Sequence, residues 1–128
     1  MSRYNIIYQK YQDENKIFSS NYISDSLIQN AGFGVFAGKN YKKGDTVEIS
    51  PFIEIDSNNS IHAYTFDSHL NQNKKLVMLG KASLINHSED NNIIFENLDN
   101  SRLMNFYAVK NIQKDDELYL KYGNNIVF

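Results

Sequence analysis

The chain has 128 residues, no cysteine, and thirteen Lys and Arg against fifteen Asp and Glu, a formal net charge of −2. This length suits one domain with its own core, and the lack of cysteine excludes disulfides, thiolate metal clusters and a cysteine nucleophile. Three separated histidines do not favour a zinc site, and the slightly acidic charge argues against a nucleic-acid binder. Without a signal peptide or a long apolar run, we expect an intracellular protein, nuclear or cytoplasmic, with no membrane partner.

The first part of the chain is predicted to be an extension. We place it at residues 1–20, ahead of one compact domain at residues 21–128. Apolar residues recur at helical spacing between Tyr4 and Tyr11, so the extension is either a short helix or an extended arm.

The remainder of the chain predicts a mostly β domain. Its apolar runs are short, rich in Ile, Val, Phe and Tyr, and separated by turn residues. The expected strands are Tyr22–Leu27, Gly34–Ala37, Thr46–Ile49, Phe52–Ile55, Asn92–Glu96, Met104–Ala108 and Glu117–Lys121.

Turns and helices are also indicated by local composition. Polar turns are expected at Asn40–Asp45, Asn97–Arg102 and Asn111–Asp116, the second of them within a hairpin. Helix is sparse, with short helical turns expected at Lys75–Gly80 and at Leu84-Ile85.

Three segments carry residues suited to chemistry. Gly32-Phe33-Gly34 permits positive φ or close backbone approach to a ligand, although a plain tight turn explains it as well. It lacks the third glycine of a dinucleotide fingerprint and the Lys of a phosphate loop. Asn86-His87-Ser88 does not sit in a nucleophile elbow, which argues against a hydrolase. Asp116–Gly123 is either an edge strand or a means of presenting the hydroxyl of Tyr122.

Taken together, the order and spacing of these segments resemble the SET-domain protein lysine methyltransferases. That family has a Gly-x-Gly, then Asn-His-Ser-x-x-Pro-Asn, then Glu-Glu-Leu-x-x-x-Tyr; here Gly32–Gly34, Asn86–Asn92 and Asp116–Tyr122 stand in those places. The resemblance covers about residues 22–123 and is greatest to compact viral and bacterial members without cysteine-rich flanks. It implies a β-clip-like fold of several small sheets, with short helices and a C-terminal segment threaded in a knot-like manner.

The resemblance also implies a cofactor, S-adenosylmethionine. Its binding residues would be the backbone of Gly32, Phe33 and Gly34, joined by Tyr64, Asn86 and the backbone of His87. Glycine would be needed because a Cβ obstructs close approach to the cofactor. No metal is expected.

The implied reaction is transfer of the sulfonium methyl group to a lysine amine, with Tyr122 as the catalytic residue that orients the amine. Glu117 would hold the threaded segment. The substrate channel would be lined by Phe95, Phe106 and Leu120, although Phe95 is equally well explained as a core residue.

The expected partner is a protein with a basic, lysine-bearing tail, a histone above all. Acidic residues expected at the surface would favour it: Glu48, Glu54, Asp56, Asp67, Glu89 and Asp90. A homodimer is one way to complete the substrate channel. Departures from the family pattern are Asn91 in place of Pro and Leu120-Lys121 in place of an aromatic-Asp pair. They motivate one alternative, a catalytically weak SET module that binds protein or cofactor without transfer. A further alternative is an unrelated all-β interaction domain in which the motifs match by chance.

Overall fold

The computed structural model describes residues 19–56, 65–67 and 74–122. The elements are β1 (Tyr22–Asp25), β2 (Phe33–Phe36), β3 (Thr46–Asp56), β4 (Thr65–Asp67), β5 (Lys74–Met78), the 3-10 helix η2 (Gly80–Leu84), β6 (Asn86–His87), β7 (Ile93–Asn97), β8 (Leu103–Ala108) and β9 (Tyr119–Leu120). Within these residues they form an antiparallel pair β1-β2, a five-stranded sheet β4-β5-β3-β8-β7 and a parallel pair β6-β9. The predicted mostly β fold of several small sheets is confirmed.

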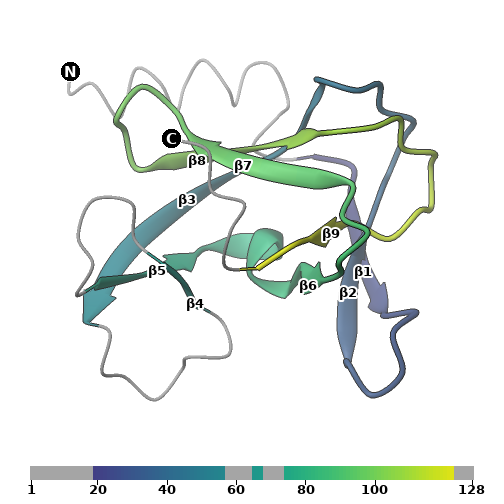
Figure 1. The fold of residues 1–128 in the computed structure, drawn as a ribbon, viewed down its shortest axis with the longest axis horizontal. Coiled ribbons are helices and arrows are strands. Elements are labelled where there is room, and N and C mark those ends of the chain that lie inside the picture. Colours follow the sequence, from purple (N-terminus) through teal and green to yellow (C-terminus); the bar gives the residue numbers. More distant parts are fainter. Residues whose placement is uncertain (1–18, 57–64, 68–73, 123–128) are drawn as a thin grey trace.

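The longest strand, β3, connects two halves of the large sheet, as Figure 1 shows. Its first half pairs with β8 as far as Pro51, and its second half pairs with β5 from Phe52 onward. The sequence predicted two separate strands here, and that was wrong. Proline interrupts a strand only where the ladder of hydrogen bonds needs a backbone N–H at its position. Pro51 stands where β3 exchanges one partner for the other, and its carbonyl still accepts a hydrogen bond from the amide of Leu79 at 2.9 Å.

The prediction of helical turns at Lys75–Gly80 was also wrong for most of that run. Residues 74–78 form strand β5, in which Leu76 and Met78 are buried at alternate positions, and helix begins only at Gly80. Pairing with β3 decides this, because tertiary contacts outweigh the weak local preference of a short segment.

The hydrophobic core lies beneath the β7-β8 hairpin. The expected turn at residues 97–102 joins these strands, and Asp99 and Asn100 take positive φ in it, as tight hairpin turns require. Phe95 and Phe106 are direct cross-strand partners with ring centroids 5.3 Å apart. Both are buried in the main core cluster, so this hairpin covers one side of the hydrophobic core.

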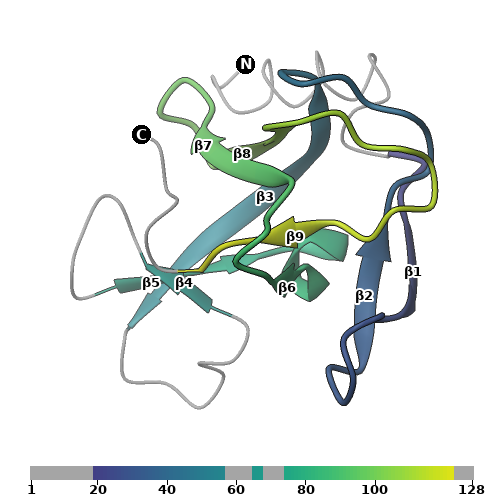
Figure 2. The same cartoon turned by 45° about the vertical axis from the view of Figure 1, so that its right-hand side comes forward.

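The C-terminal strand is enclosed within the domain. In both views β9 runs beside β6, and the two are paired in parallel through Asn86 with Tyr119 and His87 with Leu120 (Figures 1 and 2). Parallel neighbours need a crossover, which here consists of the β7-β8 hairpin and the segment after it. Leu118 and Leu120 are fully buried. This enclosed segment brings the last sequence motif against the middle one.

The residues just before β1 are anchored by a polar cluster, formed by Ser19, Asn21, Glu48 and Lys81, which we call the Glu48 cluster. Ser19 donates to the Glu48 carboxylate at 2.6 Å and Asn21 donates to it at 3.0 Å. The ammonium of Lys81 donates to the carbonyls of Ser19 and Asn21. Glu48 was expected at the surface; it is 3% exposed, because β3 turns it toward these partners.

Candidate active site

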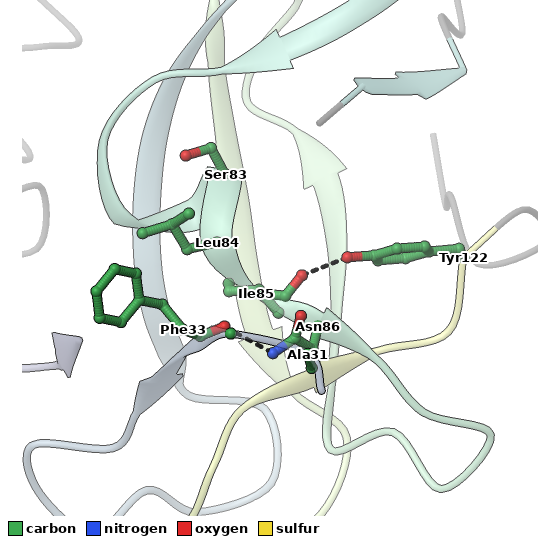
Figure 3. A pocket seen from close by; sticks show the side chains of 8 residues that line it. Ala31, Phe33, Ser83, Leu84, Ile85, Asn86 and Tyr122 are labelled. Carbon is green, nitrogen blue, oxygen red and sulfur yellow. Dashed lines mark hydrogen bonds between the residues drawn. The ribbon is translucent and has the colours of Figure 1, made fainter. Parts of the chain in front are cut away.

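A pocket of about 240 Å³ lies where the first two motifs and the last one meet, shown in Figure 3. It is lined by Ala31, Gly32, Phe33, Ser83, Leu84, Ile85, Asn86 and Tyr122. These residues come from the β1-β2 connection and the start of β2, from helix η2 and the start of β6, and from the segment after β9. The fold therefore brings together positions that are up to about ninety residues apart in the chain.

The two glycines of the first motif have different structural roles. Gly32 has φ +77°, and the direction of an added Cβ is open for 4 Å, so its backbone borders free space. Gly34 has no such freedom, because a Cβ there would collide with the carboxylate of Glu117, whose Cδ would lie at 2.9 Å. The sequence attributed both glycines to cofactor approach, whereas the structure shows that Gly34 makes room for Glu117.

Asn86 joins the first motif to the middle one. Its amide donates to the carbonyl of Phe33 at 2.9 Å, the contact drawn in Figure 3, and to Glu117 at 3.2 Å. Asn86 thus fixes the Gly-x-Gly segment against β6. The side chain that the sequence assigned to the cofactor also holds the pocket together.

Glu117 lies behind the pocket and is 3% exposed. Its carboxylate accepts hydrogen bonds from Ser26 Oγ at 2.8 Å, from the Leu27 amide at 2.8 Å and from the Tyr119 hydroxyl at 3.0 Å, besides Asn86. Burial, and next the hydrogen bond to Glu117, raise the pKa of Tyr119 to about 12. We call Glu117 and these four donors the Glu117 cluster. Ser26 and Leu27 were missed by sequence reasoning, since they match no motif and reach Glu117 only through the fold.

Tyr122 lies across the pocket from the Gly-x-Gly segment. Its hydroxyl donates to the carbonyl of Ile85, and its backbone amide donates to Nδ1 of His87 at 2.8 Å. Burial raises the pKa of Tyr122. The phenol is therefore protonated at neutral pH, and its hydroxyl serves as a hydrogen-bonding group rather than as a base.

The model of the SET-domain family matches residues 32–123. This chain belongs to the SET-domain family. A solved structure from Plasmodium falciparum, of a protein provisionally classified as a histone methyltransferase, is 34% identical with a TM-score of 0.65. The match covers 81% of this chain and 97% of that chain.

Larger proteins share the fold at lower identity. A structure of Chaetomium thermophilum Polycomb repressive complex 2 bound to S-adenosylmethionine is 21% identical, with a TM-score of 0.65 over 84% of this chain. A humanized mutant of that complex bound to an inhibitor is 20% identical, with a TM-score of 0.68 over 84%. The match spans only 15% of either Polycomb chain, so these structures show a shared fold. Comparison with curated proteins gave no match.

The residues predicted to line the substrate channel lie in the core of this SET domain. Phe95 is 3% exposed, and Phe106 and Leu120 are 0% exposed. This burial fits the packing role that was the alternative for Phe95, and the channel role of all three stays a prediction. Tyr64, predicted to contact the cofactor, lies outside the described residues.

Two further features concern metals and membranes. Within residues 19–56, 65–67 and 74–122, no group of three or more His, Asp or Glu side chains is arranged to hold a metal ion. None of the helices in this described part is long and apolar enough to cross a membrane.

Proposed function

We propose that this SET domain transfers a methyl group from S-adenosylmethionine to a lysine side chain of a protein, with a histone tail as the favoured substrate. The observation that carries the proposal is that Gly32, Asn86 and Tyr122, one from each motif, line a single pocket. Membership of the SET family and the 34% identity to the Plasmodium protein support it.

The pocket fits one part of S-adenosylmethionine. The backbone of Gly32 borders open space, and Phe33 beside it is 59% exposed, so its ring offers an apolar surface to a ligand. The volume of about 240 Å³ is below the roughly 300–1,000 Å³ of most ligand pockets, so we expect the cofactor to extend beyond it. The backbone of His87 and the side chain of Tyr64 remain proposed contacts. The bound cofactor would supply an electrophilic methyl group.

Tyr122 would orient the lysine amine. While its O–H donates to the carbonyl of Ile85, the hydroxyl oxygen keeps lone pairs that accept a hydrogen bond from the amine. The amine must be neutral to attack, and apolar surroundings favour the neutral form. Catalysis would then come from positioning and from fixed dipoles, with no covalent intermediate on the enzyme.

The surface charges give limited support to a basic substrate. Three of the expected acidic residues form ion pairs with lysines of the chain: Asp56 with Lys74 at 2.6 Å, Asp90 with Lys110 at 2.7 Å, and Glu89 with Lys121 at 3.3 Å. The choice of a histone therefore relies on the relatives more than on charge. A histone substrate would place the protein in a nucleus, and a homodimer remains a proposal that light scattering would test.

The test is a calorimetric titration with S-adenosylmethionine, followed by a tritiated methyl assay on core histones and mass spectrometry of the products. We expect binding, transfer and a defined modified lysine. Tyr122→Phe should keep cofactor binding and lose transfer by about a hundredfold. Tyr22→Phe is the matched control, because it removes an exposed hydroxyl that bonds Asp115 at 2.7 Å and lies outside the pocket. Absence of cofactor binding together with absence of transfer to any protein would refute the proposal.

A second candidate is a SET module that binds its ligands with little or no transfer. It is favoured by the contact between Tyr122 and Ile85, which occupies the hydroxyl proton, and by Asn91 in place of the family's Pro. Measurable cofactor or peptide binding without turnover on a broad peptide array would decide for this candidate.

A further inference from the structure

The imidazole of His87 contacts the backbone of Tyr122. The Tyr122 amide donates to Nδ1 of His87 at 2.8 Å, and the two rings lie 5.2 Å apart between centroids. An amide N–H can donate only to a ring nitrogen that carries no proton. The geometry therefore requires the tautomer of His87 in which Nδ1 is bare and Nε2 holds the hydrogen.

The other ring nitrogen faces an acidic group. Nε2 of His87 lies 3.4 Å from Oε1 of Glu89, whose other oxygen lies 3.3 Å from the ammonium of Lys121. A carboxylate beside Nε2 favours a proton on that nitrogen and leaves Nδ1 as the acceptor. Glu89 is the acidic partner of this ring, and Lys121, which pairs with Glu89, directly precedes Tyr122.

The contact matters because of where Tyr122 stands. Strand β9 ends at Leu120, and Tyr122 lies beyond its end. Its amide is held by His87 and its hydroxyl by Ile85, the two residues on either side of Asn86. The main chain and the hydroxyl of Tyr122 are thus fixed at two neighbouring points of one segment, and the imidazole sets the first.

We propose that the His87 side chain is a positioning residue, whose bare Nδ1 holds the main chain of Tyr122 so that the hydroxyl faces the pocket. This inference rests on the proposed function as far as turnover is concerned. Turnover should therefore depend on an unprotonated acceptor at the place of Nδ1, because only an acceptor can hold the Tyr122 amide.

Two variants distinguish the role of Nδ1 as an acceptor from the space that the side chain fills. In His87→Asn the side-chain oxygen takes about the place of Nδ1, whereas in His87→Gln the amide extends toward Nε2. We expect His87→Asn to keep a larger share of kcat than His87→Gln, because its side-chain oxygen can still accept the Tyr122 amide. His87→Gln should lower kcat about fivefold at neutral pH, since one hydrogen bond is worth about 1 kcal/mol. Cofactor affinity should stay unchanged in both, because the proposed contact of residue 87 with the cofactor is through its backbone.

A measurement without turnover tests the contact itself. Imidazole nitrogen NMR should show the His87 signal in the tautomer with Nδ1 unprotonated. The His87 signal is the one that His87→Asn removes, while His62 and His69 remain as references. A proton on Nδ1 at neutral pH, or equal kcat in the two variants, would overturn the proposal. The expected tautomer in a protein that transfers no methyl group would support the contact and refute the proposed function instead.

Discussion

Two buried glutamates join distant parts of this SET domain, and each is 3% exposed. Glu117 accepts hydrogen bonds from neutral donors on the β1-β2 connection, on β6 and on β9. Glu48 accepts from Ser19 and Asn21 and lies 3.9 Å from the ammonium of Lys81. The first cluster therefore assembles the pocket, whereas the second anchors the residues before β1 on β3 and η2.

The difference shows how one residue type serves two purposes. In the Glu48 cluster, burial raises the carboxyl pKa above its ordinary 4.5, although the bonds from Ser19 and Asn21 and the charge of Lys81 act in the opposite direction. The desolvation of the Glu48 carboxylate thus costs free energy, while its hydrogen bonds hold the residues before β1 in place. In the Glu117 cluster the carboxylate is the common acceptor that determines where three segments meet. We expect its loss to affect stability and cofactor binding together.

The largest effect is expected for Glu117→Gln. The substitution replaces one acceptor oxygen with an NH2 donor, which would face the donors from Ser26, Leu27 and Tyr119. We therefore expect a loss of about 3 kcal/mol in the free energy of unfolding. Cofactor affinity should fall as well, because Asn86 and the Gly-x-Gly segment lose their common partner. Urea unfolding and calorimetric titration measure the two effects. Glu48→Gln is the matched control, and we expect it to lose about 1 kcal/mol at neutral pH with unchanged cofactor affinity. Equal losses in the two variants would remove the distinction between the clusters.

A smaller effect is expected for Gly34→Ala. The new Cβ would press on the Glu117 carboxylate, and we expect this overpacking to lower the free energy of unfolding by about 2 kcal/mol. Gly44→Ala is the control, because Gly44 has φ +93° with nothing within 4 Å of an added Cβ in an exposed turn, and should lose about 1 kcal/mol from backbone strain alone. Cofactor affinity should fall only in Gly34→Ala. An unchanged affinity there would show that the pocket tolerates displacement of Glu117.

The smallest effect is a pH dependence from Glu48. Because its folded-state pKa is raised, the folded protein holds this proton more tightly than the unfolded chain does. The part of the stability that is linked to this proton is then fully present below pH 4.5 and is lost as the pH rises through the folded-state pKa, whereas the hydrogen bonds from Ser19 and Asn21 remain. We expect the free energy of unfolding of the wild type, relative to Glu48→Gln, to fall as the pH is raised from 4 to 8. A difference that rises with pH would mean that the bonds from Ser19 and Asn21 outweigh burial.

The prediction of the fold from the sequence succeeded where local patterns decide. The Asn97–Arg102 turn and the β7-β8 hairpin were predicted because a polar run between two apolar runs has one common outcome. Strand β5 and the continuity of β3 across Pro51 were not, because both depend on which strand lies alongside. Glu48 was expected at the surface for the same reason, since its partners at residues 19, 21 and 81 are distant in the sequence.

The sequence by itself determined the family, because the residue types and spacing of three motifs are recognisable from the sequence alone. It also indicated that Glu117 holds the C-terminal segment. Only the tertiary structure decided how the motifs depend on one another: why Gly34 must be small, which donors surround Glu117, and that His87 supports Tyr122. The physical reason is that a motif records residues near in the chain, whereas hydrogen bonds and steric contacts act between atoms that only folding brings within about 3 Å.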